Sequence, residues 1–383
     1  MTLSIILPLI ILLSSSSATA LSYFSVTDFG ANPNGKIDAT KPFLKAWNSA
    51  CRSIRPAVVY VPKGRFLLKT TIFYGPCKNS PIRFKMNGIL IAVSNYKVLR
   101  PSGTWIRFEY VHGLSIYGHG TIDGQGQSLW ACKRAHRSCP FSAKSLSIGH
   151  SSKIRISGLK FINSKFFHMF IYGSKEVSVK NCKFIAPGNS PNTDGIHIQY
   201  SSEITIRNSQ MMTGDDCISI GPGSSNVWIE GIFCGPGHGI SIGSLGHTKD
   251  ESGVRNVTVK KVKFSGTTNG IRIKTWGRPS NGFVKKVTFD DITMSDVRNP
   301  IHINQNYCPH NRGCPNKHSG ISINGVVFSN VKGSSSTLIA VKFDCSKTHP
   351  CTNIKLNNIN LTYMKKTSQT SCKHVSGRSS KCF

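Results

Sequence analysis

An internal repeat runs from about residue 154 to residue 361, and it restricts the fold more than any other feature of the sequence. Each unit alternates apolar and polar residues, bends at a polar or small residue and resumes with an apolar residue, which predicts two short strands joined by a bend. The eight units begin at Ile154, Val177, Ile204, Val227, Val257, Val287, Ile321 and Ile354. Their starts lie 23 to 34 residues apart with no helical period between them, so we expect an all-β, single-domain parallel β-helix with one coil per repeat.

A further short strand follows in five of these units, at residues 195–198, 217–220, 239–242, 270–273 and 300–303. The residues directly before these strands are Asp194, Asp216, His238, Asn269 and Asn299. The first three are separated from one another by 22 residues, so on successive coils their side chains should stack about 4.8 Å apart. The pattern therefore predicts a column of polar side chains along one face of the solenoid.

Two cations lie close to this column in the repeat. Ile271 and Ile273 alternate with Arg272 and Lys274, so both cations should point outward on the side of the column. Together with Asp215, the sequence neighbour of Asp216, the column predicts three acids, an imidazole and two cations at one place. A single Asp before a strand is usually a turn or cap residue, but the stacking of several favours a functional site.

Three neighbouring carboxyl groups have the chemistry that glycosidic bond cleavage requires. One must deliver a proton to the leaving oxygen, and another must activate water or attack the sugar. Mutual repulsion can keep one member protonated while the others stay ionised. Arg272 and Lys274 could then hold the carboxylate of a uronic acid unit.

The first twenty residues contain an unbroken apolar run without a charged side chain, followed by serines and small residues. This pattern predicts a signal peptide at residues 1–20 and a secreted, extracellular protein with one β-helix catalytic domain at residues 21–383. The run is too short for a membrane span of about 20 residues, so we expect no membrane association. Two acceptor sequons, at Asn256 and Asn360, fit an exported chain.

The chain has 48 Lys and Arg against 16 Asp and Glu, a net charge of +32. Such an excess predicts a polyanionic partner. Outside the cell, an acidic polysaccharide is a better candidate than nucleic acid, which we do not expect as a partner. The alternative is that the charge only maintains solubility and holds the protein loosely on a wall.

Thirteen cysteines form six close sequence pairs and leave Cys182 over. In an oxidising compartment these pairs favour disulfides over metal ligands, although spacing alone does not fix the connectivity. The expected pairs are Cys51 with Cys77, Cys132 with Cys139, Cys217 with Cys234, Cys308 with Cys314, Cys345 with Cys351, and Cys372 with Cys382. Cys182 occupies an apolar column of the repeat, so we expect a buried thiol without a catalytic role.

At the acidic residues the sequence resembles the polygalacturonase family of glycoside hydrolases, plant type. The motifs that carry the resemblance are NTDG at 192–195, GDDC at 214–217, GHG at 237–239 and RIK at 272–274, with a tyrosine at Tyr307. The resemblance covers nearly the whole mature chain. It implies a right-handed solenoid and inverting hydrolysis of the α-1,4 linkages of pectate (homogalacturonan), by a monomer acting in the plant cell wall matrix without metal or cofactor.

The same resemblance implies catalytic roles for Asp215, Asp194, Asp216 and His238. Asp215 would be the general acid, Asp194 with Asp216 would activate the water, and His238 would share the proton of the acid. The implied substrate-binding residues are Arg272, Lys274, Asn192 and Tyr307. Asn192 and Gly214 also fit a plainer role as turn formers.

Several points stay open at the level of sequence. Neighbouring residues of an ideal strand face opposite ways, so a bend must bring Asp215 and Asp216 into one cleft. A Ca²⁺-dependent pectate lyase, a non-catalytic pectin-binding protein and a hydrolase of branched or rhamnose-containing pectin are the alternatives. Endo or exo action would depend on loops at the ends of the cleft, such as Trp130 to Pro140.

Overall fold

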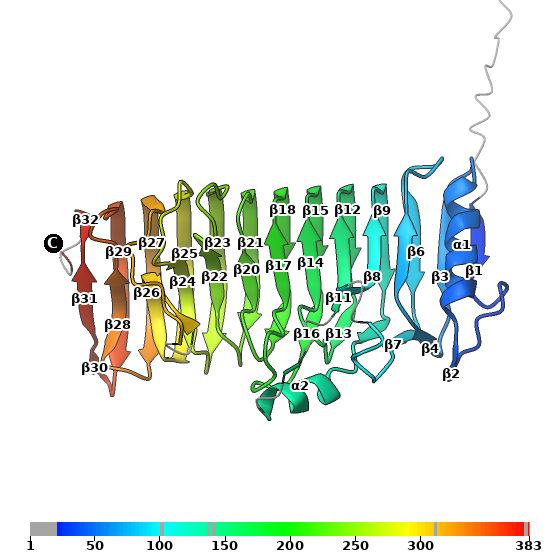
Figure 1. Cartoon of the computed structure of the whole chain (residues 1–383), viewed down its shortest axis with the longest axis horizontal. Helices are drawn as coiled ribbons and strands as arrows, with labels where there is room; N and C mark the ends of the chain where they lie inside the picture. The colour runs from blue at the N-terminus through cyan, green and yellow to red at the C-terminus, as the bar shows by residue number, and fades with distance from the viewer. Residues whose placement is uncertain are drawn as a thin grey trace, which may run out of the picture.

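The structure is a computed structural model that describes residues 21–99, 103–135, 138–139, 143–309, 312–378 and 382. The predicted signal peptide lies outside these residues. Within them, parallel strands form coils that stack along one axis from the N-terminal to the C-terminal end (Figure 1). No helix of the described ranges is long and apolar enough to cross a membrane.

The described strands belong to two sheets. The smaller sheet has 11 strands and consists of β5 (Thr71–Tyr74), β8 (Thr104–Glu109), β11 (Lys144–Gly149), β14 (Met169–Tyr172), β17 (Ile196–Gln199), β20 (Ile218–Ile220), β22 (Ile240–Leu245), β24 (Asn269–Trp276), β26 (Asn299–Tyr307), β28 (Ile339–Asp344) and β31 (Gln369–Lys373). It contains all five of the second strands predicted from the sequence. Their register is also as expected, since Ile196 pairs with Ile218, which pairs with Ile240.

The larger sheet has 21 strands and bends around the rest of each coil. Its strands are β1 (Ser22–Ser25), β2 (Asn34–Asp38), β3 (Ala57–Val61), β4 (Arg65–Leu68), β6 (Ile82–Met86), β7 (Ile89–Ala92), β9 (His112–Gly118), β10 (Thr121–Asp123), β12 (Ser152–Ser157), β13 (Lys160–Ile162), β15 (Lys175–Lys180), β16 (Lys183–Ile185), β18 (Ser202–Arg207), β19 (Gln210–Met212), β21 (Ser225–Cys234), β23 (Val254–Ser265), β25 (Phe283–Val297), β27 (Ser322–Ser335), β29 (Cys351–Tyr363), β30 (Lys366–Thr367) and β32 (Val375–Arg378).

Residues at the predicted bends adopt left-handed backbone conformations, which explains the polar or small residue in the middle of each repeat. Glycine, asparagine and aspartate tolerate a positive φ better than most residues do. The bend residues with positive φ are Gly158, Asn181, Asn208, Gly231, Lys261, Asp291, Asn330 and Asn358. The bend lets the apolar residues on both sides of it face the interior of the coil.

One unit of the predicted repeat was wrong in register. The unit placed at Ile321 in fact begins at Val326, because Val326 pairs with Val287 on one side and with Ile354 on the other. The pattern misleads here because Gly333 interrupts the apolar column in the observed register, whereas a start five residues earlier gives an apolar residue at every required position. The column that contains Ile292 therefore continues through Val331.

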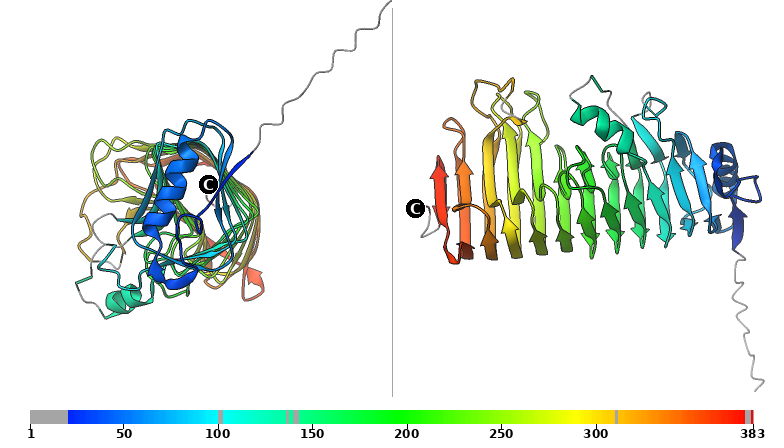
Figure 2. Two further views of the ribbon diagram at one scale, coloured as in Figure 1. Left: turned by 90° about the vertical axis from the view of Figure 1, so that its right-hand side faces the viewer. Right: turned by 90° about the horizontal axis from the view of Figure 1, so that it is seen from below.

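The core is the apolar interior of the coils, where identical or similar side chains stack from coil to coil. Phe161 and Phe184 stack with ring centroids 4.8 Å apart, and Phe289 and Phe328 stack at 5.2 Å. Helix α1 (Thr40–Arg52) covers the N-terminal end of this interior (Figure 2, left). Its buried residues recur at helical spacing, namely Phe43, Ala46, Trp47, Ala50 and Cys51.

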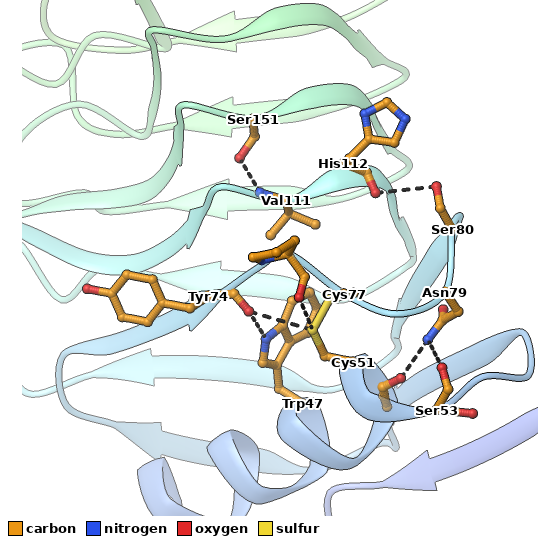
Figure 3. Close-up of a disulfide and its surroundings, with 12 residues drawn as sticks. Trp47, Cys51, Ser53, Tyr74, Cys77, Asn79, Ser80, Val111, His112 and Ser151 are labelled. Atoms are coloured by element: carbon orange, nitrogen blue, oxygen red, sulfur yellow. Dashed lines mark hydrogen bonds between the residues drawn. A yellow bond between two sulfur atoms is a disulfide. The ribbon is translucent and has the colours of Figure 1, made fainter.

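All six expected disulfides are present, and Cys182 is a free, buried thiol. The pair Cys51 and Cys77 fastens α1 to the first coils (Figure 3). In the same region the indole N–H of Trp47 donates to the carbonyl oxygen of Tyr74 at 2.9 Å. The Asn79 amide donates to two carbonyl oxygens at the end of the helix.

Candidate active site

The acids lie in the turns that lead into two adjacent strands of the smaller sheet. Asp194 is two residues before β17, and Asp215 and Asp216 lie between β19 and β20. The backbone N–H of Gly195 donates to the carbonyl oxygen of Asp216 at 3.0 Å, so Asp194 and Asp216 occupy the same place on successive coils. This confirms the stacking predicted from the 22-residue spacing.

A bend between β19 and β20 brings the neighbouring Asp215 and Asp216 into one site. The backbone N–H of Asp216 donates to Oδ1 of Asp215 at 2.8 Å, and the N–H of His238 donates to the carbonyl oxygen of Asp215 at 2.8 Å. Gly214 starts this bend, and a Cβ at this position would collide with the backbone of Ser190. The chain therefore leaves the extended conformation here, as the two adjacent acids require.

Asp216 is almost fully buried and is held by cations from a strand two coils further on. Arg272 Nη2 lies 2.8 Å from Oδ1, and Lys274 Nζ lies 2.7 Å from Oδ2. The hydroxyl of Ser241 donates to Oδ1 at 2.9 Å. Both cations point outward from β24 as expected, but here they pair with Asp216 and compensate its charge.

Asp215 forms a pair with His238, whose Nδ1 donates to Oδ1 of Asp215 at 3.0 Å. This hydrogen bond, opposed by burial, raises the pKa of His238 above its ordinary value. Burial by itself would raise the pKa of Asp215, but the hydrogen bond and charge of His238, together with Lys274, hold that pKa below its usual range. One proton therefore belongs to the pair, and it lies on the imidazole in the free site.

Asp194 is buried and receives one side-chain hydrogen bond, from the Ser219 hydroxyl to Oδ2 at 2.6 Å. Burial, followed by the charges of Asp215 and Asp216, raises the pKa of Asp194 well above its ordinary value. The three acids thus differ in environment: Asp216 is paired with two cations, Asp215 is paired with His238, and Asp194 has a raised pKa and no cationic partner among the described residues. This division is the one expected for neighbouring acids that cannot all ionise.

Asn192 and Tyr307 complete the set of predicted site residues. The Asn192 amide lies 3.5 Å from Oδ2 of Asp215, and its backbone has φ 58°, so both the supporting role and the turn-forming role fit. The Tyr307 ring has Lys274 Nζ 5.3 Å and the Arg272 guanidinium 5.9 Å from its centroid. The structure brings all eight predicted residues together.

A cavity of about 210 Å³ opens over these groups. Its lining combines the acids with aromatic and small residues, namely Phe166, Phe167, Asn192, Asp194, His197, Asp215, Asp216, Ser219, Gly243, Ser244, Lys274 and Tyr307. The mixture of flat aromatic rings with few, converging polar groups is typical of a small-molecule or sugar subsite.

Sequence reasoning missed the serines that orient the acids. Ser219 of β20 pairs with Ser241 of β22, and Ser241 pairs with Arg272 of β24. The two serines therefore occupy the same outward position of their strands as Arg272 does. The register of the second strands contained this signal, because it aligns these three residues directly. The donors to Asp194 and Asp216 could therefore have been found from the repeat.

Helix α2 (Gln127–Arg134) also contributes to the site, through a contact that no pattern in the sequence indicates. Its Lys133 Nζ donates to Oδ1 of Asn192 at 2.8 Å. Figure 2, right, shows α2 rising from the same side of the solenoid as the yellow and orange loops near the C-terminal end. The segment from Trp130 to Pro140, expected beside the cleft, is described only in part, and its Lys133 does reach the site.

The atoms of Asp215, Asp216 and His238 that could bind a metal lie within 4.8 Å of one another. Both oxygens of Asp216 are occupied by cations, and Oδ1 of Asp215 accepts from His238. Ca²⁺ needs six to eight oxygen ligands with net negative charge. The charge of this cluster is already compensated, so it fits a Ca²⁺ site poorly.

Acids in separate electrostatic environments, on one face of a parallel β-helix, define a class of enzyme that cleaves glycosidic bonds by acid–base chemistry. Comparison with known proteins agrees, since the profile of Glycosyl hydrolases family 28 matches residues 51–382. The chain belongs to this family, and it is a glycoside hydrolase.

Relatives match along nearly the whole chain. A polygalacturonase of Prunus persica is 51% identical over 375 residues, which cover 98% of this chain and 95% of that protein. An exopolygalacturonase of Platanus acerifolia is 41% identical, with 89% of this chain and 90% of that protein covered. The family resemblance predicted from the four motifs is confirmed.

Solved structures agree on the fold. The polygalacturonase of Erwinia carotovora ssp. carotovora has a TM-score of 0.72 at 26% identity, with 94% of this chain and 97% of that chain covered. An endo-xylogalacturonan hydrolase from Aspergillus tubingensis has a TM-score of 0.81 at 23% identity, with 95% and 98% covered. The predicted right-handed parallel β-helix is confirmed.

Proposed function

We propose that this protein is a secreted polygalacturonase that hydrolyses α-1,4-galacturonosyl linkages of pectate in the plant cell wall. The observation that carries the proposal is the separation of the three acids into distinct protonation environments beside Arg272 and Lys274. The net charge of +32 supports an acidic polymer as the substrate. Six disulfides and exposed sequons at Asn256 and Asn360 support an extracellular location.

In the proposed reaction, Asp215 protonates the glycosidic oxygen as the bond from the anomeric carbon to that oxygen breaks. Asp216 takes a proton from a water whose oxygen attacks the same carbon from the opposite face, and Asp194 helps to hold that water. Arg272 and Lys274 bind the carboxylate of the sugar, and Tyr307 contacts its ring. Asn192 supports Asp215, and we propose no metal or cofactor for these steps.

The proton must move before this reaction can occur, because the free site holds it on His238. A bound galacturonate chain brings further negative charge beside Asp215, and like charge raises the pKa of a carboxyl group. We therefore expect substrate binding to transfer the proton of the pair from His238 to Asp215. The raised pKa of Asp194 makes this carboxyl the competing candidate for the acid.

The stereochemical outcome needs its own measurement. Carboxylate oxygens of Asp215 and Asp216 lie within 4.8 Å of each other, closer than the roughly 6.5–9.5 Å of most inverting pairs. Inversion is therefore proposed from the family resemblance and not from carboxyl separation. NMR of the first product should show the β-anomer at the new reducing end, and an initial α-anomer would overturn inversion.

The test of the function is the release of reducing ends from polygalacturonate by wild type and Asp215→Asn. We expect wild type to release them and the variant to lose about 10²- to 10⁴-fold in kcat, the usual contribution of a general acid. Asp291→Asn is a matched control, since Asp291 lies exposed at a bend of the larger sheet. A wild type that binds the polymer without cleaving it would overturn the proposal.

The same assay separates the remaining alternatives. Products that absorb as unsaturated uronides, with activity lost on chelation, would indicate a lyase. Faster release from rhamnose-containing pectin than from polygalacturonate would indicate a different substrate in the same family. The size of the early products distinguishes endo from exo action.

A further inference from the structure

A second hollow on the smaller sheet lies on the N-terminal side of the catalytic cavity. It has a volume of about 200 Å³ and is formed by β8, β11 and β14. Its charged and aromatic lining residues are Arg107, Glu109, Lys144, His150, Phe170 and Tyr172. None of them belongs to the site described above.

The hollow continues the catalytic face without a break. The outward positions of the strands are in register from Arg107 through Ser147 and Phe170 to His197, which lines the catalytic cavity. The rings of Phe170 and His197 stack with centroids 5.6 Å apart. Strand β11 is two strands away from β17, which corresponds to about 10 Å at the usual strand spacing.

The hollow contains one acid, and that acid is already neutralised. Glu109 is buried, with its Oε2 3.1 Å from Nε of Arg107 and its Oε1 2.6 Å from Nδ1 of His150. Each oxygen of its carboxylate therefore already has a partner, and neither forms an ion pair with Lys144.

Lys144 is a cation that has no counter-ion among the described residues. Its Nζ lies 4.8 Å above the centroid of the Phe170 ring, and no carboxylate of the described residues lies within ion-pair distance of it. Burial, followed by the charge of Arg107, lowers the pKa of Lys144 below its ordinary value. A half-buried ammonium group next to a second cation is unfavourable unless an anion binds there.

We infer that this hollow is a distal subsite that binds the carboxylate of a galacturonate unit several sugars away from the cleaved bond. Lys144 forms the ion pair with that carboxylate, and Phe170 and Tyr172 present flat rings to the sugar. The inference rests on the proposed function, and it adds a preference for long chains that are not esterified. A methyl ester at the distal unit removes the charge that Lys144 recognises.

The test measures KM for a series of galacturonate oligomers of increasing length with wild type, Lys144→Met and Lys144→Arg. We expect Lys144→Met to raise KM about tenfold, or about 1.4 kcal/mol, only for oligomers long enough to reach the hollow. Lys144→Arg should restore most of the affinity. Methyl esterification of the polymer should reduce the difference between wild type and Lys144→Met.

Lys183→Met is the matched control, since Lys183 is an exposed lysine of β16 in the larger sheet. We expect it to leave KM unchanged at every length. An equal rise in KM for Lys144→Met at all lengths, or an equal effect of the two variants, would overturn the inference, because either result indicates a general effect of charge.

Binding of the same oligomers to Asp215→Asn, measured by calorimetry, gives a readout independent of hydrolysis. We expect the affinity of Asp215→Asn to rise with oligomer length. In the double variant Asp215→Asn with Lys144→Met this rise should be lost. That pair of results supports the subsite even if the reaction assignment fails. Cleavage of short oligomers without a length effect of Lys144 would overturn the subsite and leave the proposed function intact. Thermal unfolding of each variant verifies that it is folded.

Discussion

The imidazole of His238 donates a hydrogen bond from Nδ1 to Oδ1 of Asp215 at 3.0 Å, and this pair holds one proton between its two members. The pKa of His238 is raised and that of Asp215 is lowered by the same contact. The alkaline limit of activity should therefore be the pH at which the pair loses its proton. In wild type this pH lies above 6.5, the ordinary pKa of histidine.

His238→Gln should move the alkaline limb of the pH profile to lower pH by more than about one unit. Glutamine can donate a hydrogen bond but carries no charge, so the proton must then be held by the Asp215 carboxyl alone. The pH dependence of kcat/KM measures this limb, and His349→Gln, at an exposed position outside the site, should leave it in place. An unchanged limb in His238→Gln would assign the transferred proton to another group, such as Asp194.

The sequence predicted the fold well because the physical constraint on each coil repeats. Residues such as Ile204 and Ile206 must face the interior of every coil, so the period of two and the polar bend recur along the chain. The catalytic column followed from the same register, which placed Asp194 and Asp216 on successive coils. The register failed at Ile321, because Gly333 interrupts the apolar column of the observed register and a start five residues earlier matches the pattern better.

The partners of the acids were harder to predict, because they depend on contacts between coils at the level of individual atoms. Arg272 and Lys274 were expected to face a substrate carboxylate, and in the structure both contact Asp216. Lys133 reaches Asn192 from a helix that interrupts the repeat. An insertion of this kind leaves no periodic signal, so sequence reasoning located the loop near the cleft but not its contact.

Asp194→Asn should stabilise the fold at neutral pH while it reduces activity. The folded state raises the pKa of the Asp194 carboxyl above its unfolded value of 3.8. Below pH 3.8 the group is protonated in both states and does not oppose folding. As the pH rises from 3.8 through the folded value, the unfolded state ionises first, and the free energy of unfolding falls. Asparagine removes this penalty, and we expect a gain on the order of 1–2 kcal/mol at pH 7. Chemical denaturation at several pH values measures the difference, which should shrink toward pH 3.8; a loss of stability at pH 7 would contradict the assignment.

Asp216→Asn should destabilise the protein by about 3–5 kcal/mol, because it leaves two nearly buried cations without a counter-charge. The exposed fractions of the Arg272 and Lys274 side chains are 11% and 9%. The free energy of unfolding from urea titrations measures the loss. Asp216→Asn thus acts in the opposite direction to Asp194→Asn, although both remove one carboxylate from the same cleft.

A second substitution tests whether uncompensated charge causes that loss. Asp216→Asn combined with Lys274→Met removes one of the two unpaired cations, so the double variant should be more stable than Asp216→Asn alone. If the double variant loses as much free energy of unfolding as the two single variants together, Asp216 and Lys274 are not coupled. Packing would then be the cause of the loss in Asp216→Asn.

Cys182 should be unreactive in the folded protein and should react once on unfolding. The other twelve cysteines form disulfides, and burial raises the pKa of the Cys182 thiol to about 11. Its thiolate fraction at neutral pH is therefore very small, and its position inside a coil excludes the reagent. Labelling with iodoacetamide followed by mass spectrometry should find no adduct in native protein and one adduct in denaturant without reductant. Labelling of the native protein, or more than one adduct, would contradict the buried position of Cys182 or the set of six disulfides.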